Sequence, residues 1–296
     1  MAKMKWMKKP KPQLHVVSLS GGKDSTAMLL RMLEENMPVD IILFCDTGLE
    51  FPEMYEHLAK LEQETGRPIT RIRSFHTFEY FLTQKEILIK HRKNQDQRNY
   101  RGYGWPGPLN RWCTKELKTI PRERFLRQLQ QRYDIIEYIG LAADETYRFE
   151  RKENQKENGR HPLADWGMTE ADCLRYCYAH GYTWGGLYEK YARVSCWCCP
   201  LQPLSELRIL YRDYPLQWAT LKEWDSRTWR EYKPGYTVGQ LEARFTFENQ
   251  WVQAGKEMKG KAFHAALKEY LENGNKCNDH SEDTGGETLS REVQPA

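Results

Sequence analysis

Short apolar runs alternate with stretches of helical periodicity along the first half of the chain. Apolar runs of strand length occur at residues 14–19, 39–45, 69–72 and 134–140. Helical spacing of apolar residues is found at residues 28–33, 51–65 and 122–133, the last with Pro121 at its start. Strands that alternate with helices are typical of a mostly parallel sheet with helices on both faces. We therefore expect an α/β domain with a parallel twisted sheet over residues 14–165.

The pattern changes after residue 165. A capped helix is predicted from Thr169 to His180, ending at Gly181, and a loop rich in Trp, Tyr, Gly and Cys leads to Pro200. Helical patterns with many aromatic residues continue to about residue 271. We expect a helical, aromatic-rich C-terminal unit with a cysteine cluster over residues 166–272. The flanking segments are predicted to be a basic arm over residues 1–13 and a disordered acidic tail over residues 273–296.

Length and composition support this organisation and exclude several classes of protein. At roughly 150 residues per domain, a chain of 296 residues predicts two domains or one enlarged domain. No apolar run approaches the roughly 20 residues of a membrane span, and no apolar region follows the basic N-terminus. Eight cysteines are too sparse for a disulfide scaffold. We expect a cytoplasmic protein without a membrane partner, whose cysteines are reduced thiols or metal ligands.

The most specific motif is Ser-Gly-Gly-Lys-Asp-Ser, at residues 20–25, between the first strand and the first helix. Helix N-termini present unpaired backbone N–H groups and the positive end of the helix dipole, so they bind anions. The glycines permit close backbone approach, Ser20 and Ser25 supply hydroxyl donors, and Lys23 adds a positive charge. Asp24 could cap the helix or hold Mg²⁺. The segment predicts a phosphate-binding loop that differs from the Walker pattern.

At these residues the chain resembles the PP-loop ATP pyrophosphatases, and within them the phosphoadenosine phosphosulfate (PAPS) reductase-like family. Further matches are Asp-Thr-Gly-Leu-Glu-Phe-Pro-Glu at residues 46–53 and Gly-Leu-Ala-Ala-Asp-Glu at residues 140–145. In the second match Ala142 replaces an arginine of the family pattern, and Thr146 replaces a serine. The resemblance spans residues 14–205 and implies an adenine nucleotide α-hydrolase-like fold.

The resemblance also implies an ATP site with Mg²⁺ at the ends of the first two strands. It implies these catalytic residues: Lys23, Asp24, Asp46, Glu145 and Arg148. The nucleotide-binding residues that it implies are Ser18, Ser20, Gly21, Gly22, Lys23, Asp24, Ser25, Phe44, Asp46, Thr47, Asp144 and Arg151. For the acids and arginines of residues 144–151, solvated surface pairs are the alternative interpretation.

The chain departs from the reductases of this family in two places. Those enzymes carry a degenerate phosphate loop and a mobile C-terminal segment with a nucleophilic cysteine. Here the loop has the intact ATP-splitting form, and Cys277 in the C-terminal segment has a different sequence context. These differences favour cleavage of ATP at the α,β bond over reduction of a sulfonucleotide. An acceptor oxygen would attack the α-phosphorus, and a sulfur nucleophile would then displace AMP.

Four cysteines are candidates for a metal centre. Cys196 and Cys199 form a C-x-x-C motif, with Cys198 between them, and Cys113 precedes a helical stretch. Thiolates of this number suit an iron–sulfur cluster or zinc, while a plain thiol group is the third interpretation. The resemblance favours a [4Fe–4S] cluster on Cys113, Cys196 and Cys199, with Cys198 as a possible fourth ligand. The remaining cysteines before the tail are predicted to lie in the core: Cys45, Cys173 and Cys177.

Residues 90–132 carry twelve basic and three acidic side chains, although the whole chain has a net charge of only +4. Tyr100, Tyr103, Trp105 and Trp112 are interleaved with these charges. Such a mixture can contact phosphates and stack on bases, so the segment predicts a nucleic-acid or other phosphorylated acceptor. The alternative is a solvated charged loop whose aromatic residues anchor it to the core.

These observations predict an enzyme of the PP-loop ATP pyrophosphatase group that adenylates an acceptor and supports sulfur transfer through an iron–sulfur centre. A sulfur or electron donor protein is a possible partner. The first alternative is a phosphoadenylyl- or adenylyl-sulfate reductase that makes sulfite. The second is a nucleotide-binding zinc module in a nucleic-acid modification or defence system.

Overall fold

The computed structural model describes residues 10–87 and 100–279, and these residues form two compact units. Unit 1 contains the described residues up to Glu206 together with Arg227–Arg230, and unit 2 contains Leu207–Ser226 and the described residues from Glu231 onward. Within the described part of the chain, no helix is both long and apolar enough to cross a lipid bilayer.

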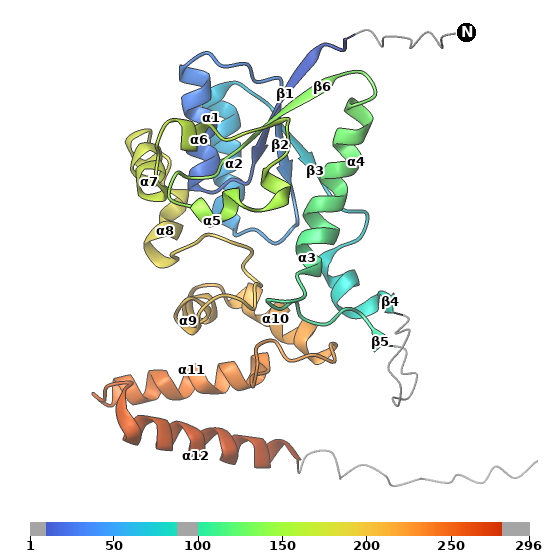
Figure 1. Ribbon diagram of the computed structural model, residues 1–296. Coiled ribbons are helices and arrows are strands. Elements are labelled where there is room, and N and C mark those ends of the chain that lie inside the picture. The colour runs from blue at the N-terminus through green and yellow to red at the C-terminus, as the bar shows by residue number, and fades with distance from the viewer. Residues whose placement is uncertain (1–9, 88–99, 280–296) are drawn as a thin grey trace, which may run out of the picture. The chain divides into compact units, whose positions relative to one another are not determined.

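A five-stranded parallel sheet forms the centre of unit 1 (Figure 1). The strand order is β3-β2-β1-β6-β7, and each neighbouring pair is parallel. The strands are β1 (Gln13–Leu19), β2 (Ile41–Cys45), β3 (Ile69–Ile72), β6 (Asp134–Ile139) and β7 (Gly159–Arg160). The chain moves outward in one direction from β1 to β3 and then crosses to the other side of β1 with β6. This change of direction creates a switch point at the carboxyl ends of β1 and β6, where α/β folds bind ligands.

Helices cover both faces of the sheet, as the sequence predicts. Helix α4 (Ile120–Leu129) packs Leu126 against Val16, Leu43 and Ile135 on one face. The helices α1 (Lys23–Glu34) and α2 (Pro52–Thr65) lie on the other side (Figure 1). Side chains of a strand alternate between the two faces, so each buried strand contributes to both layers. The parallel α/β architecture expected from the sequence is therefore confirmed.

Shorter elements complete unit 1, and they lie in the segments that follow β3, β6 and β7 in the chain. They are η1 (Tyr80–Gln84), β4 (Glu86–Ile87), β5 (Tyr100–Arg101), α3 (Trp112–Thr114), η2 (Lys115–Thr119), α5 (Thr146–Phe149), η3 (Lys152–Asn154), α6 (Pro162–Asp165), α7 (Glu170–Ala179), η4 (Trp184–Gly186) and α8 (Leu187–Lys190). Thr169 caps α7, because its side chain and that of Asp172 bond each other's backbone N–H.

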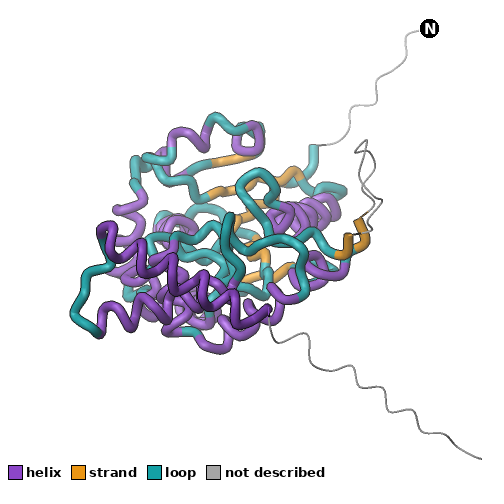
Figure 2. Tube along the Cα trace, turned by 90° about the horizontal axis from the view of Figure 1, so that it is seen from below, coloured by secondary structure: helices purple, strands orange, loops and turns teal. Residues whose placement is uncertain are grey.

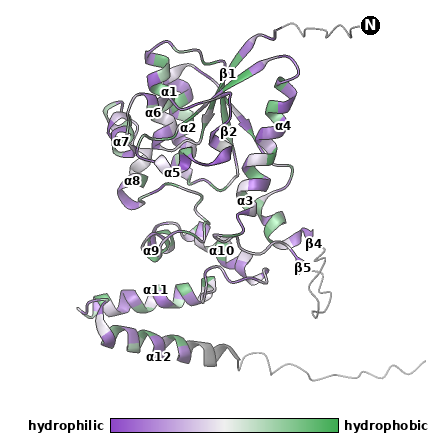
Figure 3. Ribbon diagram, in the orientation of Figure 1, coloured by the Kyte–Doolittle hydropathy of each residue, from purple (hydrophilic) through white to green (hydrophobic). Residues whose placement is uncertain are grey.

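Unit 2 is helical and rich in aromatic residues. Its elements are α9 (Leu204–Asp213, of which the first residues belong to unit 1), α10 (Pro215–Ser226), α11 (Val238–Gln253) and α12 (Gly260–Asp279). Helices α11 and α12 run side by side, joined by a short loop (Figures 1 and 2). Figure 3 shows polar and apolar residues alternating along both helices, whereas β1 and β2 are mostly apolar. The helical C-terminal unit expected from the sequence is thus present.

Two boundaries differ from those expected from the sequence. Residues 166–206, including the cysteine loop, belong to unit 1, because α7 packs on α1 and Trp197 N–H donates to Leu49 O at 3.0 Å. The tail expected from residue 273 is helical as far as Asp279 within α12. A helix that has been nucleated extends at little further cost, so α12 continues past the last apolar residues. Residues 280–296 and residues 1–9 of the expected arm lie outside the described residues.

Candidate functional site

The phosphate loop lies between β1 and α1, at the switch point of the sheet. Gly21 has a φ of +80°, and a Cβ there would lie 2.5 Å from the sulfur of Met54, so only glycine fits without movement. The hydroxyls of Ser20 and Ser25 lie 2.9 Å apart. Gly22 caps α1 without a side-chain hydrogen bond, so Asp24 does not cap this helix. The first-turn amides of α1 therefore face the loop without partners from the helix itself.

Lys23 is the positive centre of the loop. Its Nζ lies 2.6 Å from Glu170 Oε2 and 3.2 Å from Asp24 Oδ2. Burial disfavours the ammonium, but these two carboxylates outweigh it and raise the pKa of Lys23. The backbone N–H of Lys23 donates to the hydroxyl of Tyr188 at 2.8 Å. Glu170 and Tyr188 therefore complete the loop from α7 and α8, and sequence reasoning missed the contacts of both.

Asp24 has one buried carboxylate oxygen without a hydrogen-bond partner among the described residues. Its Oδ1 is buried and accepts no hydrogen bond from the described residues, while Oδ2 receives Lys23 Nζ. Burial raises the pKa of Asp24, and the charges of Glu170 and Glu145 add to this effect. A buried carboxylate oxygen without a donor is a suitable ligand for a hard cation such as Mg²⁺.

Asp46 follows β2 and organises the second loop of the site. It is 2% exposed and accepts from Arg73 Nε, Tyr55 OH and the Gly48 N–H, each at 2.9 Å. Burial favours the neutral acid, but these donors prevail and hold the pKa of Asp46 below its usual value. Because its oxygens are occupied by protein donors, Asp46 shapes the loop on which Thr47 lies.

Two of the predicted nucleotide-binding side chains point away from the phosphate loop. The hydroxyl of Ser18 donates to Glu137 Oε1 at 2.6 Å, on the face covered by α4, where Arg122 also bonds that carboxylate. Phe44 is 1% exposed and belongs to the core. Both lie in strands, so alternation turns their side chains into the packed layers rather than toward the sheet edge. Phe44 is therefore enclosed in the core, whereas Ser18 is half-buried and its hydroxyl is held by Glu137.

The segment after β6 forms the other side of the loop. Glu145 is 8% exposed and receives Arg148 Nη1 on both oxygens, at 2.7 and 2.8 Å. Asp144 accepts the N–H of Glu170 at 3.0 Å, which fixes the start of α7. Arg151 is exposed, with its guanidinium 5.5 Å from the ring centre of Tyr147. Glu145 thus lies near Asp24, while Arg151 faces outward.

The cysteine loop contacts the loop that follows β2. Cys196 Sγ lies 3.8 Å from Glu50 Oε1 and 3.9 Å from Thr47 Oγ1. The N–H of Cys199 donates to Cys196 O at 3.1 Å, which closes a tight turn. The predicted nucleotide and cysteine segments therefore meet at one edge of the sheet, although about 150 residues separate Thr47 from Cys196 in sequence.

The four candidate cysteines are electrostatic neighbours. Burial raises the pKa of Cys196 to about 12, with Glu50 adding to the shift, and raises that of Cys198 well above its usual value. Cys113 contributes to the raised pKa values of Cys198 and Cys199. Among the described residues, no group of three His, Cys, Asp or Glu side chains is close enough to hold a single metal ion. The four thiols thus lie in one region of unit 1 but are too widely spaced to hold a single ion.

Lys118 provides the positive charge beside this group, and it too was missed as a site residue. Its Nζ lies 3.7 Å from Glu50 Oε1. Burial opposes its charge, but Cys196, Glu50 and the thiols of Cys45 and Cys113 outweigh burial and raise the pKa of Lys118. Lys115 and Lys118 both follow Cys113 closely in the sequence, but only the fold selects Lys118.

The three cysteines expected in the core lie as follows. Cys173 and Cys177 are fully buried, and Cys177 Sγ donates to Lys23 O at 3.4 Å. Cys45 is half-buried, with its thiol 3.7 Å from Lys118 O. Cys173 and Cys177 therefore support the phosphate loop from α7, and Cys45 supports the cysteine region from β2.

The basic aromatic segment is partly described. Of the residues counted there, 90–99 lie outside the described residues. Trp105 and Trp112 are buried, and Trp112 Nε1 donates to Gly104 O at 3.0 Å. These aromatic rings anchor the segment to the core, as the second interpretation of the segment expects. The exposed basic residues of the segment, Lys115 on η2 and Arg124 and Arg127 on α4, can still contact phosphates.

Comparison with known proteins identifies the family. The model of the phosphoadenosine phosphosulfate reductase domain matches residues 14–202. An uncharacterised protein of Methanocaldococcus jannaschii is 25% identical over 234 residues, covering 76% of this chain and 43% of that protein. An uncharacterised 37.8 kDa protein of Escherichia phage 186 is 26% identical over 253 residues, covering 72% of this chain and 74% of the relative. The chain thus spans less than half of the archaeal relative.

Among solved structures, the U34-tRNA thiolase NcsA from Methanococcus maripaludis, with its [4Fe–4S] cluster, is similar over 96% of this chain and 80% of that one. Its sequence identity is 15% and its TM-score is 0.34. The family match covers the sheet, the phosphate loop and the cysteine loop. The chain therefore belongs to the phosphoadenosine phosphosulfate reductase domain family.

Proposed function

We propose that the protein cleaves ATP between the α- and β-phosphates to adenylate an acceptor, and that it supports sulfur transfer to that acceptor. The observation that carries this proposal is the contact between Cys196 and Thr47, 3.9 Å apart. It joins a thiol group to the loop that lies beside an intact phosphate-binding loop. ATP cleavage and sulfur chemistry would thus share one edge of the sheet.

The phosphates of ATP would bind at the N-terminus of α1. The first-turn amides and the hydroxyls of Ser20 and Ser25 can donate to the β- and γ-phosphates, and the helix dipole favours their charge. Lys23 would exchange its bond to Glu170 for a bond to phosphate. Asp24 Oδ1, which has no partner, would hold Mg²⁺ against the same oxygens.

The proposed reaction has two balanced steps. An acceptor oxygen forms a bond to the α-phosphorus, the α,β-phosphoanhydride bond breaks, and pyrophosphate leaves with the electron pair of that bond. A sulfur nucleophile then forms a bond to the acceptor carbon while the carbon–oxygen bond breaks and AMP leaves. Lys23 and the loop amides stabilise the charge that develops on the departing pyrophosphate.

Cys113, Cys196 and Cys199 would hold an iron–sulfur cluster, with Cys198 as a possible fourth ligand. A polynuclear cluster holds its thiolates farther apart than one ion does, which fits the loose grouping of these thiols better than zinc. When bound, such a cluster can bind a sulfur ligand or transfer electrons. Lys118, 3.7 Å from Glu50, would offset the negative charge of the deprotonated thiols.

Product analysis tests the reaction. Purified protein incubated with ATP, Mg²⁺ and cellular RNA or DNA should release pyrophosphate, and addition of sulfide should then release AMP. Lys23→Ala should abolish both. Lys222→Ala is the matched control, because Lys222 pairs with Glu242 at 2.7 Å in unit 2. Sulfite release from a phosphosulfate nucleotide, without pyrophosphate release from ATP, would instead assign a reductase.

Metal analysis of anaerobically purified protein tests the cysteine assignment. We expect iron and acid-labile sulfide in the wild-type protein and their loss in Cys196→Ser. Cys173→Ala should retain both, because Cys173 is buried on α7 beside the phosphate loop. A colourless protein with stoichiometric zinc would contradict the cluster.

A further inference from the structure

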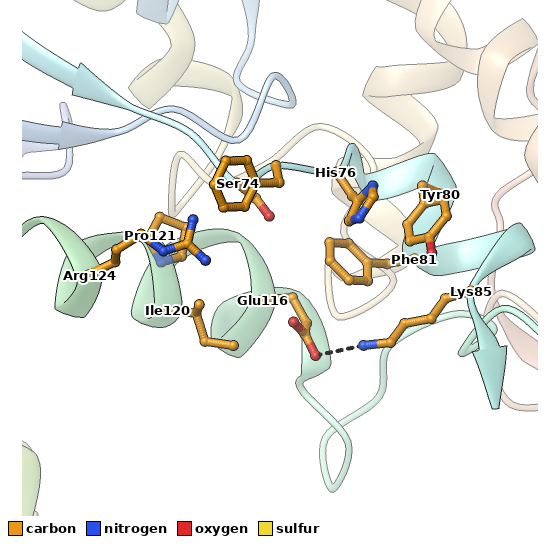
Figure 4. A pocket seen from close by; sticks show the side chains of 10 residues that line it. Ser74, His76, Tyr80, Phe81, Lys85, Glu116, Ile120, Pro121 and Arg124 are labelled. Carbon is orange, nitrogen blue, oxygen red and sulfur yellow. Dashed lines mark hydrogen bonds and ion pairs between the residues drawn. The ribbon is translucent and has the colours of Figure 1, made fainter. Parts of the chain in front are cut away.

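A cavity of about 230 Å³ lies in unit 1 between the segment that follows β3 and the helical stretch η2–α4. It is separate from the phosphate loop and from the cysteine loop. Figure 4 shows His76, Tyr80 and Phe81 on one side of the cavity and Pro121 and Arg124 of α4 on the other. The cavity therefore has an aromatic wall that faces a partly charged one.

The aromatic wall offers ring faces for stacking. His76 stacks on Tyr80, with ring centres 4.0 Å apart. Phe75 is 80% exposed, and the guanidinium of Arg124 lies 4.1 Å from its ring centre. A phenylalanine so exposed adds little to the core, but its ring can stack on a planar heteroaromatic ligand. Stacked rings and a cation above a ring are the usual means of holding an unpaired base.

The opposite wall supplies a hydrogen-bond acceptor. Glu116 Oε1 receives Lys85 Nζ at 3.2 Å and Tyr103 OH at 3.1 Å. Among the described residues, Oε2 of Glu116 has no hydrogen-bond partner. A carboxylate oxygen in this position can accept from the exocyclic amine or ring N–H of a base. The cavity thus combines a stacking surface with a polar edge.

Arg124 lines the cavity, and two further basic residues lie close in sequence to its lining residues, Lys115 before Glu116 and Arg127 three residues after Arg124. Lys115, Arg124 and Arg127 are exposed on η2 and α4, and none of them forms an ion pair with a described residue. They can contact the phosphates on either side of a bound base. The volume is below the roughly 300–1,000 Å³ of pockets for larger ligands, so it suits one ring system whose backbone remains outside.

The cavity adjoins the proposed reaction site through two residues. Ser74 in its wall directly follows Arg73, which bonds Asp46 at 2.9 Å. Lys118, which lies between Glu116 and Ile120 of the opposite wall, reaches Glu50 at 3.7 Å. A nucleotide in the cavity would therefore lie next to the loop that carries Thr47 and Glu50.

We propose that this cavity binds one unstacked base of a single-stranded nucleic acid, which is the acceptor of the reaction. The role as acceptor rests on the proposed function, whereas the binding of a base does not. The base stacks on Phe75 and is held by Glu116, and the flanking phosphates contact Lys115, Arg124 and Arg127.

Fluorescence anisotropy with labelled single-stranded RNA and DNA oligonucleotides tests the site on the full chain, in the absence of ATP. Phe75→Leu, which removes the ring and keeps an apolar side chain, should weaken binding about tenfold, and Phe75→Trp should retain it. Lys115→Ala should reduce the slope of log affinity against log salt by about 0.7. Lys261 is another exposed lysine that forms no ion pair with a described residue, and Lys261→Ala should leave the affinity and the salt dependence unchanged.

Three results would overturn the proposal: unchanged binding by Phe75→Leu, equal binding of duplex and single strand, or a mononucleotide that binds as tightly as the oligonucleotide. The last result would assign the cavity to a free nucleotide. Pyrophosphate release, measured in parallel, separates the two proposals. Loss of that release with intact oligonucleotide binding rejects the reaction alone, and absence of oligonucleotide binding with intact release rejects the cavity alone.

Discussion

Lys23 Nζ of the phosphate loop lies 2.6 Å from Oε2 of Glu170, the first residue of α7. The lysine that would bind phosphate is thus already paired with a carboxylate from a distant helix. The Lys23 side chain is largely shielded, whereas that of Glu170 is nearly half exposed, so solvent screens part of the attraction. Phosphate would therefore compete with this carboxylate for the lysine.

Glu170→Gln should therefore strengthen ATP binding about two- to fivefold, the range for a partly exposed ion pair. Removing the charge leaves Lys23 without its strongest competitor for phosphate. Titration calorimetry with ATP and Mg²⁺ measures the effect, and Glu64→Gln, which alters the exposed pair with Lys60, serves as the control. Weaker binding in Glu170→Gln would show that this carboxylate assists the nucleotide or its metal ion.

Gly21→Ala should destabilise the protein more than Gly66→Ala does. Both glycines have positive φ, but a Cβ at Gly21 would meet the sulfur of Met54 at 2.5 Å, whereas nothing lies within 4 Å at Gly66. The positive φ alone costs about 1–2 kcal/mol, and Gly21→Ala adds the displacement of Met54. Urea unfolding of both variants measures the difference, and equal losses would mean that Met54 moves freely.

His57 should make the protein less stable in mild acid. It is 4% exposed beneath the phosphate loop and lies 3.0 Å from Thr26 Oγ1. Burial, with a smaller contribution from Lys60, lowers the pKa of His57 to about 4. His57 is therefore protonated near pH 6.5 in the unfolded chain but only near pH 4 in the folded chain. Because the unfolded state binds the proton first, the protein loses stability as the pH falls from 6.5 toward 4.

The expected loss from His57 is about 3 kcal/mol across that window. His57→Gln, which can still bond Thr26, should reduce the difference in urea midpoint between pH 7 and pH 4.5. Carboxylates titrate equally in both proteins, so the comparison isolates the imidazole. If the urea midpoint changed equally between pH 7 and pH 4.5 in both proteins, protonation of His57 would not destabilise the fold.

Glu248 should be essential to the stability of unit 2. It is 1% exposed and accepts from Arg208 Nε at 2.7 Å and Arg244 Nε at 2.8 Å. Glu248→Leu leaves two partly buried guanidinium groups without their counter-charge and should cost about 1.5–3 kcal/mol. Glu257→Leu removes an exposed partner of Lys259 and should change stability by less than about 1 kcal/mol. Thermal unfolding distinguishes the two, and similar changes would contradict the burial argument.

The sequence by itself determined the features that depend on neighbouring residues. Apolar runs identified the strands from β1 to β3 and β6, and the contiguous Ser-Gly-Gly-Lys-Asp-Ser segment identified the phosphate loop. These features are local, because strand alternation, helix capping and the backbone of a tight turn are set by adjacent side chains. The family followed from the same segments.

Only the tertiary structure decided which distant residues complete the site. Glu170 and Tyr188 reach Lys23 because α7 and α8 pack beside α1, and Lys118 reaches Glu50 because η2 lies over the end of β2. Strand alternation also turned Ser18 of β1 and Phe44 of β2 into the packed layers of the sheet, away from the loops that follow these strands. Such contacts result from the packing of elements far apart along the chain, and no local pattern records them.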